Sequence, residues 1–443
     1  MRTHWSTFPA AAALLCSFCL TSSADAQLSQ QFTQIFETIL KDRLILSPGP
    51  HKGHYIDAAA EAESLLTPAL NSLIVSNISS FPLSSTTPGV TFDFSGGELV
   101  SVTEGLGPIF SDRATTTGKG RFNVGFNATY LNLTSFRGLA TDQMRFTFTH
   151  KDLNGDNILG GLDSTATEGD LIDVTMGTRI RATIFAFYAT FGITSDLDIG
   201  IAVPLINVNI SGTATAVINS FTYANQGVAA HIFGGTSTNP ILTTSVPYDQ
   251  SATGIGDIAL RLKYCIHKGS GIDLGALVDA RIPTGKKEDF MGSGKADIAI
   301  SGLLSKRMGE FVPHLNLGYE LRSADFQSDR VLLKGGFDQK LAQGVTFAFD
   351  FLGTIDVEKS KAIQLFPGTT TITDFASATN KSIRVVSLSN IPDRSNDNLY
   401  NVSAGIRYSP SAQVLILANI LVPLNDGGLR APVAPTFGVS VNL

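Results

Sequence analysis

Residues 257–267 read DIALRLKYCIH, in which apolar and polar side chains alternate. Ile258, Leu260 and Leu262 fall on one face of an extended chain. Arg261 falls on the opposite face. Because successive side chains of a β-strand point to opposite faces, this stretch predicts a strand that separates two different surroundings.

The same period of two recurs from about residue 90 to Leu443. We expect strands at 90–103, 120–134, 143–150, 170–192, 197–218, 255–267, 272–282, 295–306, 311–322, 330–340, 345–356, 398–408, 413–423 and 433–443. Short turns alternate with long polar loops at 151–169, 219–254, 283–294, 357–397 and 424–432. This asymmetry is typical of bacterial outer-membrane barrels. The sequence therefore predicts an all-β fold, a transmembrane antiparallel β-barrel of 12–14 strands with 14 favoured, over residues 90–443.

The first residues are expected to be an export signal. Arg2 precedes an apolar run, and residues 24–26 (ADA) form a cleavage site. We therefore expect a signal peptide at 1–26, a mature chain that begins at Gln27, and export to the outer membrane of a Gram-negative bacterium. Cys265 is the single cysteine of that mature chain, so an internal disulfide is excluded.

Residues 27–80 follow a different period. Their apolar side chains recur every three or four residues, which is typical of amphipathic helices. We expect a short α-helical N-terminal extension in this region. It forms either a plug inside the lumen or a pair of helices packed under the barrel on the periplasmic side.

The composition of the 443-residue chain excludes several classes of protein. Only 16% of the residues are charged, below the roughly 25% of ordinary soluble domains. No mature segment approaches the ~18 consecutive apolar residues of a membrane helix. With 32 Lys and Arg against 38 Asp and Glu, the net charge is -6, and no long basic run is present. A nucleic-acid partner is therefore not expected.

The last predicted strand ends with the chain. Phe437, Val439, Val441 and Leu443 fall on one of its faces. This pattern resembles the C-terminal signal by which outer-membrane barrels are recognised for insertion. We therefore expect the barrel-assembly machinery and the lipid bilayer of the outer membrane as partners.

Nine short strings form an ordered series along the chain. They are GPIFSDRA at 107–114, TGKGR at 117–121, FGIT at 191–194, LDIG at 197–200, VPL at 203–205, GIGDI at 254–258, IPTG at 282–285, GSG at 292–294 and LNLGY at 315–319. Over about residues 105–443, the series resembles the outer-membrane transporter family named after the meta-pathway of phenol degradation. That family is similar to barrels of the long-chain fatty-acid transporter type. The resemblance implies passage of small, often hydrophobic or aromatic compounds.

Charged side chains on the polar strand faces are candidate selectivity elements. In a water-filled lumen, opposed basic and acidic rows constrict the path and select solutes by charge and size. In a closed barrel the same residues would form structural ion pairs. The candidates are Arg121, Arg145, Arg181, Asp257, Arg261, Lys263, Asp279, Arg281, Glu320, Arg322 and Arg407. A hydrophobic route with a lateral opening would instead use Leu131, Phe185, Phe187, Leu277 and Leu352.

The polar loop at 152–163 carries candidate calcium ligands. Its oxygen-bearing side chains at positions 1, 3, 5 and 12 of a calcium loop are Asp152, Asn154, Asp156 and Asp163. The match is incomplete, because glycine stands at position 4 rather than 6 and Asp163 is shorter than the usual Glu. An ordinary Asx-rich turn is the alternative. No other cofactor is expected.

Catalysis is not expected. The histidines are scattered, and neither G-x-S-x-G nor H-E-x-x-H occurs. The predicted function is that of a porin or transporter, with facilitated diffusion of small solutes and lumen side chains as selectivity elements. The alternative is a non-conducting barrel that acts as a surface receptor or structural protein. In that case the long loops 219–254 and 357–397 would be the binding parts.

Overall fold

A computed structural model describes the chain at residues 27–46, 55–78, 92–93, 100–101, 106, 108–161, 163–269, 271–361, 363–377, 380–411 and 413–443. The predicted signal peptide at 1–26 lies outside the described residues. Within the predicted strand at 90–103, β2 (Phe92–Asp93) and β3 (Val100–Ser101) are described. They pair with each other in a sheet of their own, so the prediction of a barrel strand here was wrong.

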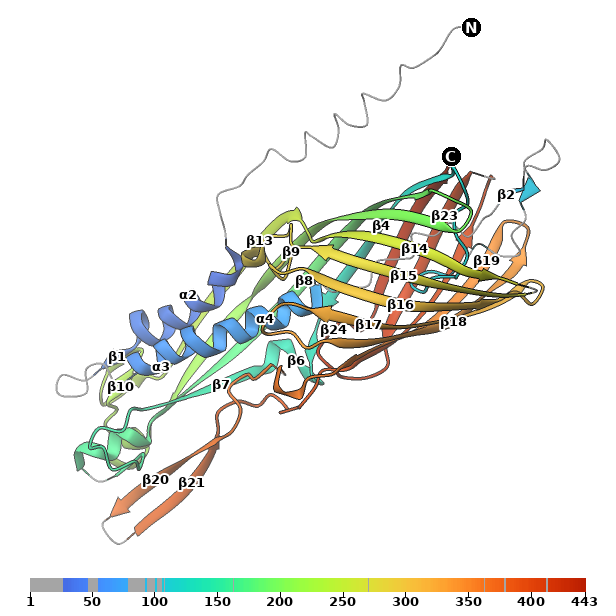
Figure 1. Ribbon diagram of the computed structural model, residues 1–443. Helices are drawn as coiled ribbons and strands as arrows, with labels where there is room; N and C mark the ends of the chain where they lie inside the picture. The colour runs from blue at the N-terminus through green and yellow to red at the C-terminus, as the bar shows by residue number, and fades with distance from the viewer. Residues whose placement is uncertain are drawn as a thin grey trace.

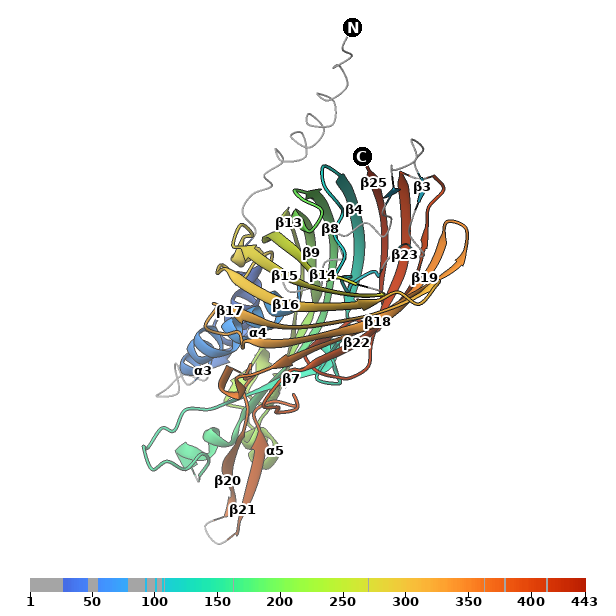
Figure 2. The ribbon, with the colours of Figure 1, turned by 45° about the vertical axis from the view of Figure 1, so that its right-hand side comes forward.

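Twelve antiparallel strands close into a barrel, which Figure 1 and Figure 2 show from two sides. They are β4 (Phe122–Leu133), β8 (Leu171–Gly192), β9 (Leu197–Asn219), β14 (Ile258–Lys268), β15 (Ile272–Ile282), β16 (Asp297–Lys306), β17 (Phe311–Arg322), β18 (Arg330–Ala342), β19 (Val345–Asp356), β22 (Leu399–Tyr408), β23 (Val414–Pro423) and β25 (Ala434–Asn442). The ring closes because β9 pairs with both β14 and β8. The predicted fold class is confirmed, with the closed strands at the lower end of the predicted count.

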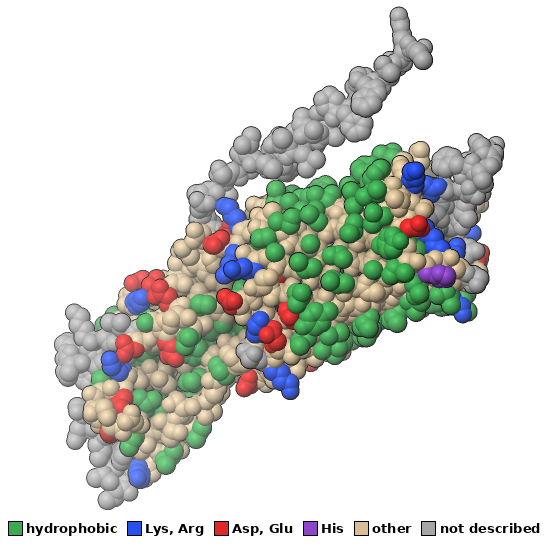
Figure 3. Space-filling view, viewed as in Figure 1, with side chains coloured by type: hydrophobic (Ala, Val, Ile, Leu, Met, Phe, Trp, Pro, Cys, Tyr) green, Lys and Arg blue, Asp and Glu red, His purple; other side chains and the backbone are tan. Residues whose placement is uncertain are grey.

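The strands alternate because their two faces meet different surroundings. On β14, the outer side chains of Leu260, Leu262 and Tyr264 are 42%, 45% and 51% exposed. Arg261 and Lys263 lie between them and are buried inside the barrel. Figure 3 shows hydrophobic side chains spread over the barrel wall, with charged side chains gathered toward its ends. An apolar belt of this kind faces lipid.

Two barrel strands continue beyond the rim as a ribbon. β8 and β9 are 22 and 23 residues long, and their outer parts pair with β7 (Met144–Thr149) and β13 (Thr243–Ile255). β7, predicted at 143–150, therefore lies outside the closed ring. β13 falls within the predicted loop at 219–254, so that part of the prediction was wrong. Val246, Tyr248 and Ala252 share one face of this strand, but Gln250 interrupts the series, so the apolar period of two is weak.

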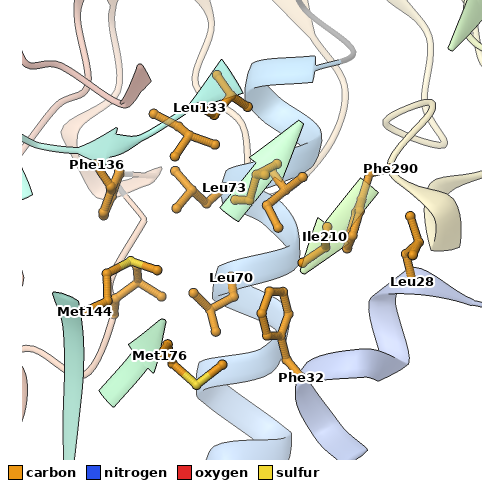
Figure 4. Packing of buried hydrophobic residues seen from close by; sticks show 14 of the residues in the cluster. Leu28, Phe32, Leu70, Leu73, Leu133, Phe136, Met144, Met176, Ile210 and Phe290 are labelled. Carbon is orange, nitrogen blue, oxygen red and sulfur yellow. The ribbon is translucent and has the colours of Figure 1, made fainter. Parts of the chain in front are cut away.

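The N-terminal helices cover this ribbon. They are η1 (Leu28–Gln30), α2 (Gln31–Glu37), the π-helical η2 (Thr38–Arg43), α3 (Ile56–Glu61), the π-helical η3 (Ala62–Leu66) and α4 (Thr67–Ile78). Figure 4 shows Phe32, Leu70 and Leu73 in one buried cluster with Met176 and Ile210 of the ribbon. The helices thus lie outside the lumen, so the plug placement was wrong, and the periplasmic side of the membrane stays a prediction. They pack on the apolar face of the ribbon where it extends beyond the barrel, and so they shield this face from water.

Short turns occupy one end of the barrel and long connections the other. Phe122 N donates to Leu443 O over 3.0 Å, which places the C-terminus at the short-turn end. Gly309 and Gly344 have φ values of +65° and +71° in two of these turns, a conformation that favours glycine. The remaining short elements are β1 (Ile45–Leu46), β5 (Ser135–Phe136), β6 (Leu139–Ala140), η4 (Thr141–Gln143), η5 (Asp163–Gly169), α5 (Phe221–Gln226), β10 (His231–Ile232), β11 (Gly234–Thr236), β12 (Asn239–Ile241), η6 (Lys287–Asp289), η7 (Lys359–Lys361), β20 (Thr369–Ser377), β21 (Asn380–Ser387) and β24 (Leu429–Arg430). Across the described part of the chain, no helix is both long and apolar enough to span a membrane.

Candidate functional site: a segment inside the barrel lumen

Residues 108–117, named here the luminal segment, lie inside the barrel. Ile109 N and Phe110 N donate hydrogen bonds to Asp350 Oδ2 over 3.2 and 3.1 Å. Asp350 is buried on the inner face of β19. On β22, a Cβ atom added at Gly405 would lie 2.7 Å from Ile109 Cδ1 and 2.6 Å from the backbone oxygen of Ala418, so glycine favours close packing here. The segment therefore packs directly against the wall.

The luminal segment crosses the lumen toward β9. Asp112 N donates to Asn316 Oδ1 over 2.8 Å, and Asn316 Nδ2 donates back to Asp112 O over 2.7 Å. At the far end, Thr117 donates to Asp198 Oδ2 from its backbone N over 2.7 Å and from Oγ1 over 3.0 Å. Asn316 belongs to β17 and Asp198 to β9. Specific side chains of separate strands thus fix the path of the backbone.

A buried charge network holds the middle of the segment. Arg113 Nε lies 3.1 Å from Asp338 Oδ1, and a second guanidinium nitrogen binds the other carboxylate oxygen. His314 Nε2 lies 2.7 Å from Asp350 Oδ1, and its Nδ1 lies 3.8 Å from Asp338 Oδ1. All four side chains are buried. Removing one partner from such a network leaves an uncompensated charge away from water.

Two of the predicted selectivity residues bind the backbone in the lumen. Lys263 Nζ donates to Arg113 O over 3.4 Å. Arg407 Nη1 donates to Leu106 O over 2.7 Å, just before the luminal segment. Both side chains are buried on inner faces of the wall. In this structure they therefore position the chain inside the lumen.

The inner faces of the strands carry a large part of the predicted set. These residues are Arg261, Lys263, Asp279, Arg281, Glu320, Arg322 and Arg407, with the apolar candidates Leu131, Leu277 and Leu352. Arg261 Nε donates to Asp279 Oδ2 over 2.8 Å, from directly paired positions on β14 and β15. Both border a cavity of about 110 Å³ that also touches Asp112, on the long-loop side of the luminal segment. This cavity brings wall charges of both signs together.

Arg181, Phe185 and Phe187 do not face the lumen. They lie on the outer face of β8, where the two phenylalanines are 38% and 40% exposed. Ile184 and Ala186, on the alternate face, are buried. The lumen prediction for these three residues was wrong. Since both faces of β8 are apolar here, their alternation did not identify the inner one.

Arg121 and Arg145 also lie apart from the lumen cavity. Arg145 belongs to β7, outside the closed ring, with Nη1 3.8 Å from Asp173 Oδ2. The prediction that it lines the lumen was therefore wrong. Arg121 precedes β4 at the short-turn rim, next to Gly118.

Asp257 anchors the connection between β15 and β16. Its carboxylate accepts hydrogen bonds from Gly285 N over 3.0 Å and from Ser293 N over 3.1 Å. Burial raises the pKa of Asp257 above its ordinary value, and these N–H groups act in the opposite direction. The residue thus orders a long connection at the rim.

The candidate calcium loop has the geometry of Asx turns. Asp152 accepts hydrogen bonds from Gly155 N over 2.7 Å and from Asn157 N over 2.8 Å. The side chain of Asp163 lies outside the described residues. Among the residues that the structure describes, no group of three or more His, Cys, Asp or Glu is placed to hold a metal ion. Calcium binding stays a prediction, which the thermal midpoint with and without a chelator tests.

Sequence reasoning did not place the luminal segment. Its string GPIFSDRA contributed only to the family resemblance. The available signal was local: the string interrupts the period of two directly before the first barrel strand, and it carries the adjacent charges of Asp112 and Arg113.

These observations define a transmembrane β-barrel whose lumen is occupied by a segment of its own chain. The chain belongs to the family described as "Putative MetA-pathway of phenol degradation", whose model matches residues 147–433. The resemblance drawn from the short strings is therefore confirmed.

Several solved structures are similar to this chain. An outer membrane channel from Pseudomonas putida F1 is 11% identical, with 75% of this chain and 99% of that chain covered and a TM-score of 0.42. A FadL homologue from Pseudomonas aeruginosa is 9% identical, with 73% and 89% covered and a TM-score of 0.29. The toluene transporter TbuX from Ralstonia pickettii is 13% identical, with 83% and 98% covered and a TM-score of 0.25. The comparison with curated proteins finds no match.

Proposed function

We propose that this protein is an outer-membrane channel for the facilitated diffusion of small solutes. The luminal segment carries the proposal, because side chains of several strands hold it where the barrel would otherwise be open. A segment held in this way narrows the path, and the wall charges beside it act on any solute that passes. Among small solutes, hydrophobic or aromatic compounds are the proposed class, in line with the family description.

The outer-membrane location is part of the same proposal. A closed barrel satisfies its backbone hydrogen bonds internally, so its apolar belt is stable in a bilayer. Short turns face the periplasm in bacterial barrels, which puts Leu443 on that side and the long connections outside. Export through a cleaved signal peptide and insertion by the barrel-assembly machinery complete this account.

Selectivity is assigned to the cavity beside the luminal segment. Arg261 and Arg281 face Asp279 and Glu320 around it. Opposed charges across a narrow path create a transverse field, which favours some solutes by charge and by size. The proposal requires neither a catalytic step nor a cofactor.

Liposome swelling tests this function. The refolded mature chain is reconstituted, and swelling rates are measured in uncharged sugars of increasing size, with heat-denatured protein as the control. We expect rates above the control that fall as the solute grows. Rates equal to the control for every sugar, also after loosening of the luminal segment, would contradict a channel and favour a receptor.

A further inference from the structure

A second, apolar chamber lies at the long-loop end of the barrel. Its volume is about 70 Å³, and leucines from β4, β23 and β24 line it. They include Leu133, Leu421 and Leu429. Ser76 and Asn77, at the C-terminal end of α4, cover it from above. The chamber therefore lies between the barrel rim and the helical cover and is partly open.

One charged side chain enters this apolar lining. Arg430 of β24 is 7% exposed and borders the chamber. Its Nη1 donates to Asn401 Oδ1 over 3.0 Å, and its Nη2 donates to Asn425 Oδ1. Its buried Nε has no hydrogen-bond partner. Both acceptors are amide oxygens, and the acidic charges of Asp426 and Asp397 act on the guanidinium without forming an ion pair with it.

Neighbouring arginines at the same rim are paired differently. Arg137 binds Asp397 over 2.9 Å, and Arg330 binds Asp356 over 3.0 Å. For Arg430, no carboxylate oxygen of the described residues lies within the 4.0 Å of an ion pair. Burial lowers the pKa of Arg430 to about 10, so it stays charged at neutral pH. A buried cation without a bound anion is costly, and a planar carboxylate matches its fork of donors.

We propose that this chamber binds a small organic carboxylate, with its apolar body among the leucines and its carboxylate on Arg430. The inference rests on the proposed channel function and names the class of solute. Leu399 and Asn401 border both this chamber and the charged lumen cavity. The two cavities are therefore adjacent, so a solute released from Arg430 lies next to the cavity that contains Arg261 and Arg281.

The size of the chamber implies that its cover moves. A cavity of about 150 Å³ is known to hold benzene, roughly twice the volume found here. An aromatic ring is therefore fully buried in the chamber only when the end of α4 shifts. Gln327 Nε2 donates to Ser76 Oγ over 3.4 Å, which is a long contact at this edge of the cover.

Binding of benzoate and benzamide to the refolded mature protein tests the proposal. The two probes share a ring and a planar head group but differ in charge. By isothermal titration calorimetry we expect benzoate to bind at least tenfold more tightly than benzamide. Arg430→Gln is expected to weaken benzoate at least tenfold and to change benzamide less than twofold. The matched control is Arg384→Gln, in the hairpin of β20 and β21, which leaves both affinities unchanged.

A second variant keeps the test decisive if Arg430→Gln does not refold. Ala431→Trp fills the chamber while Arg430 is retained, and we expect it to abolish binding of both probes. Equal affinity of the wild-type protein for benzoate and benzamide would overturn the proposal, as would full benzoate binding by either variant. If liposomes swell in sugars but the protein binds benzoate no better than benzamide, the channel function is supported and this inference is refuted. If benzoate binds but liposomes do not swell, the channel function is refuted and the carboxylate site is supported.

Discussion

Arg113 in the luminal segment and Asp338 on β18 form a buried ion pair across 225 positions of sequence, with Nε 3.1 Å from Oδ1. The pair joins a segment that precedes the barrel to a wall strand in its second half. Asp338 has no exposed surface, so the guanidinium replaces the water that its charge would otherwise bind. The luminal segment therefore supplies the partner for a buried charge of the barrel wall.

Loss of Arg113 is expected to destabilise the whole barrel. Arg113→Met leaves Asp338 charged and buried, which costs about 3–5 kcal/mol of the free energy of unfolding. Guanidinium unfolding in lipid vesicles measures this loss. The double variant Arg113→Met/Asp338→Asn removes both charges and should regain most of it. Equal stability of the wild-type protein and the single variant would show that the pair has no such role.

Reversing a charge in the lumen cavity is expected to change ion selectivity. Arg261→Glu places a carboxylate directly opposite Asp279, so the path becomes more favourable to cations. Reversal potentials in a KCl gradient measure the shift. Arg181→Glu is the matched control, because Arg181 lies on the outer face of β8. A shift of the same size in both variants would rule out Arg261 as a selectivity element.

Tethering the end of α4 is expected to slow entry into the chamber. Cysteines at Ser76 and Gln327 would link the cover to the connection between β17 and β18. Oxidation should slow benzoate association at least tenfold, and a reducing agent should restore it. As a control, cysteines at Ser29 and Asn71 link helices within the cover only. Association that is insensitive to the first tether would argue that the cover does not move.

Benzoate affinity is expected to depend on pH through Arg430. This residue lies in the connection between β23 and β25, and burial lowers its pKa to about 10. Between about pH 6 and 9 the guanidinium is charged, so affinity stays constant. Above about pH 10 binding must also take up a proton, and affinity falls by about tenfold per pH unit. Calorimetry over this range measures it. Benzamide provides the reference, and a parallel decline for both probes would indicate general unfolding.

The sequence predicted the barrel strands well because their alternation is a local property. β15 begins and ends at the predicted residues 272 and 282, and β8 differs from its prediction by one residue at its start. Each such strand separates lipid from a polar interior, so its side chains alternate clearly between apolar and polar. The ribbon strand β13 is exposed on one face, and its other face carries only the interrupted apolar series Val246, Tyr248 and Ala252.

The candidate site was harder to predict because its contacts are distant in sequence. Phe110 N and its acceptor Asp350 are 240 residues apart, and no local pattern links them. The strand register placed Arg261 and Lys263 inside correctly, because their outer neighbours are strongly apolar. Arg179 and Thr183 give the face of Arg181 the polar character expected of an inner face, although it is the outer one, so the facing depended on the three-dimensional pairing.

Single-channel conductance tests the central claim most directly. The intact mature chain is compared in planar bilayers with a variant in which residues 108–117 are replaced by a Gly-Ser sequence of equal length. An equivalent replacement of β20 residues 369–377 is the control. If the luminal segment constricts the lumen, the first variant conducts severalfold more than the intact chain, and the control matches the intact chain. Equal conductance of the intact chain and the first variant would contradict the account.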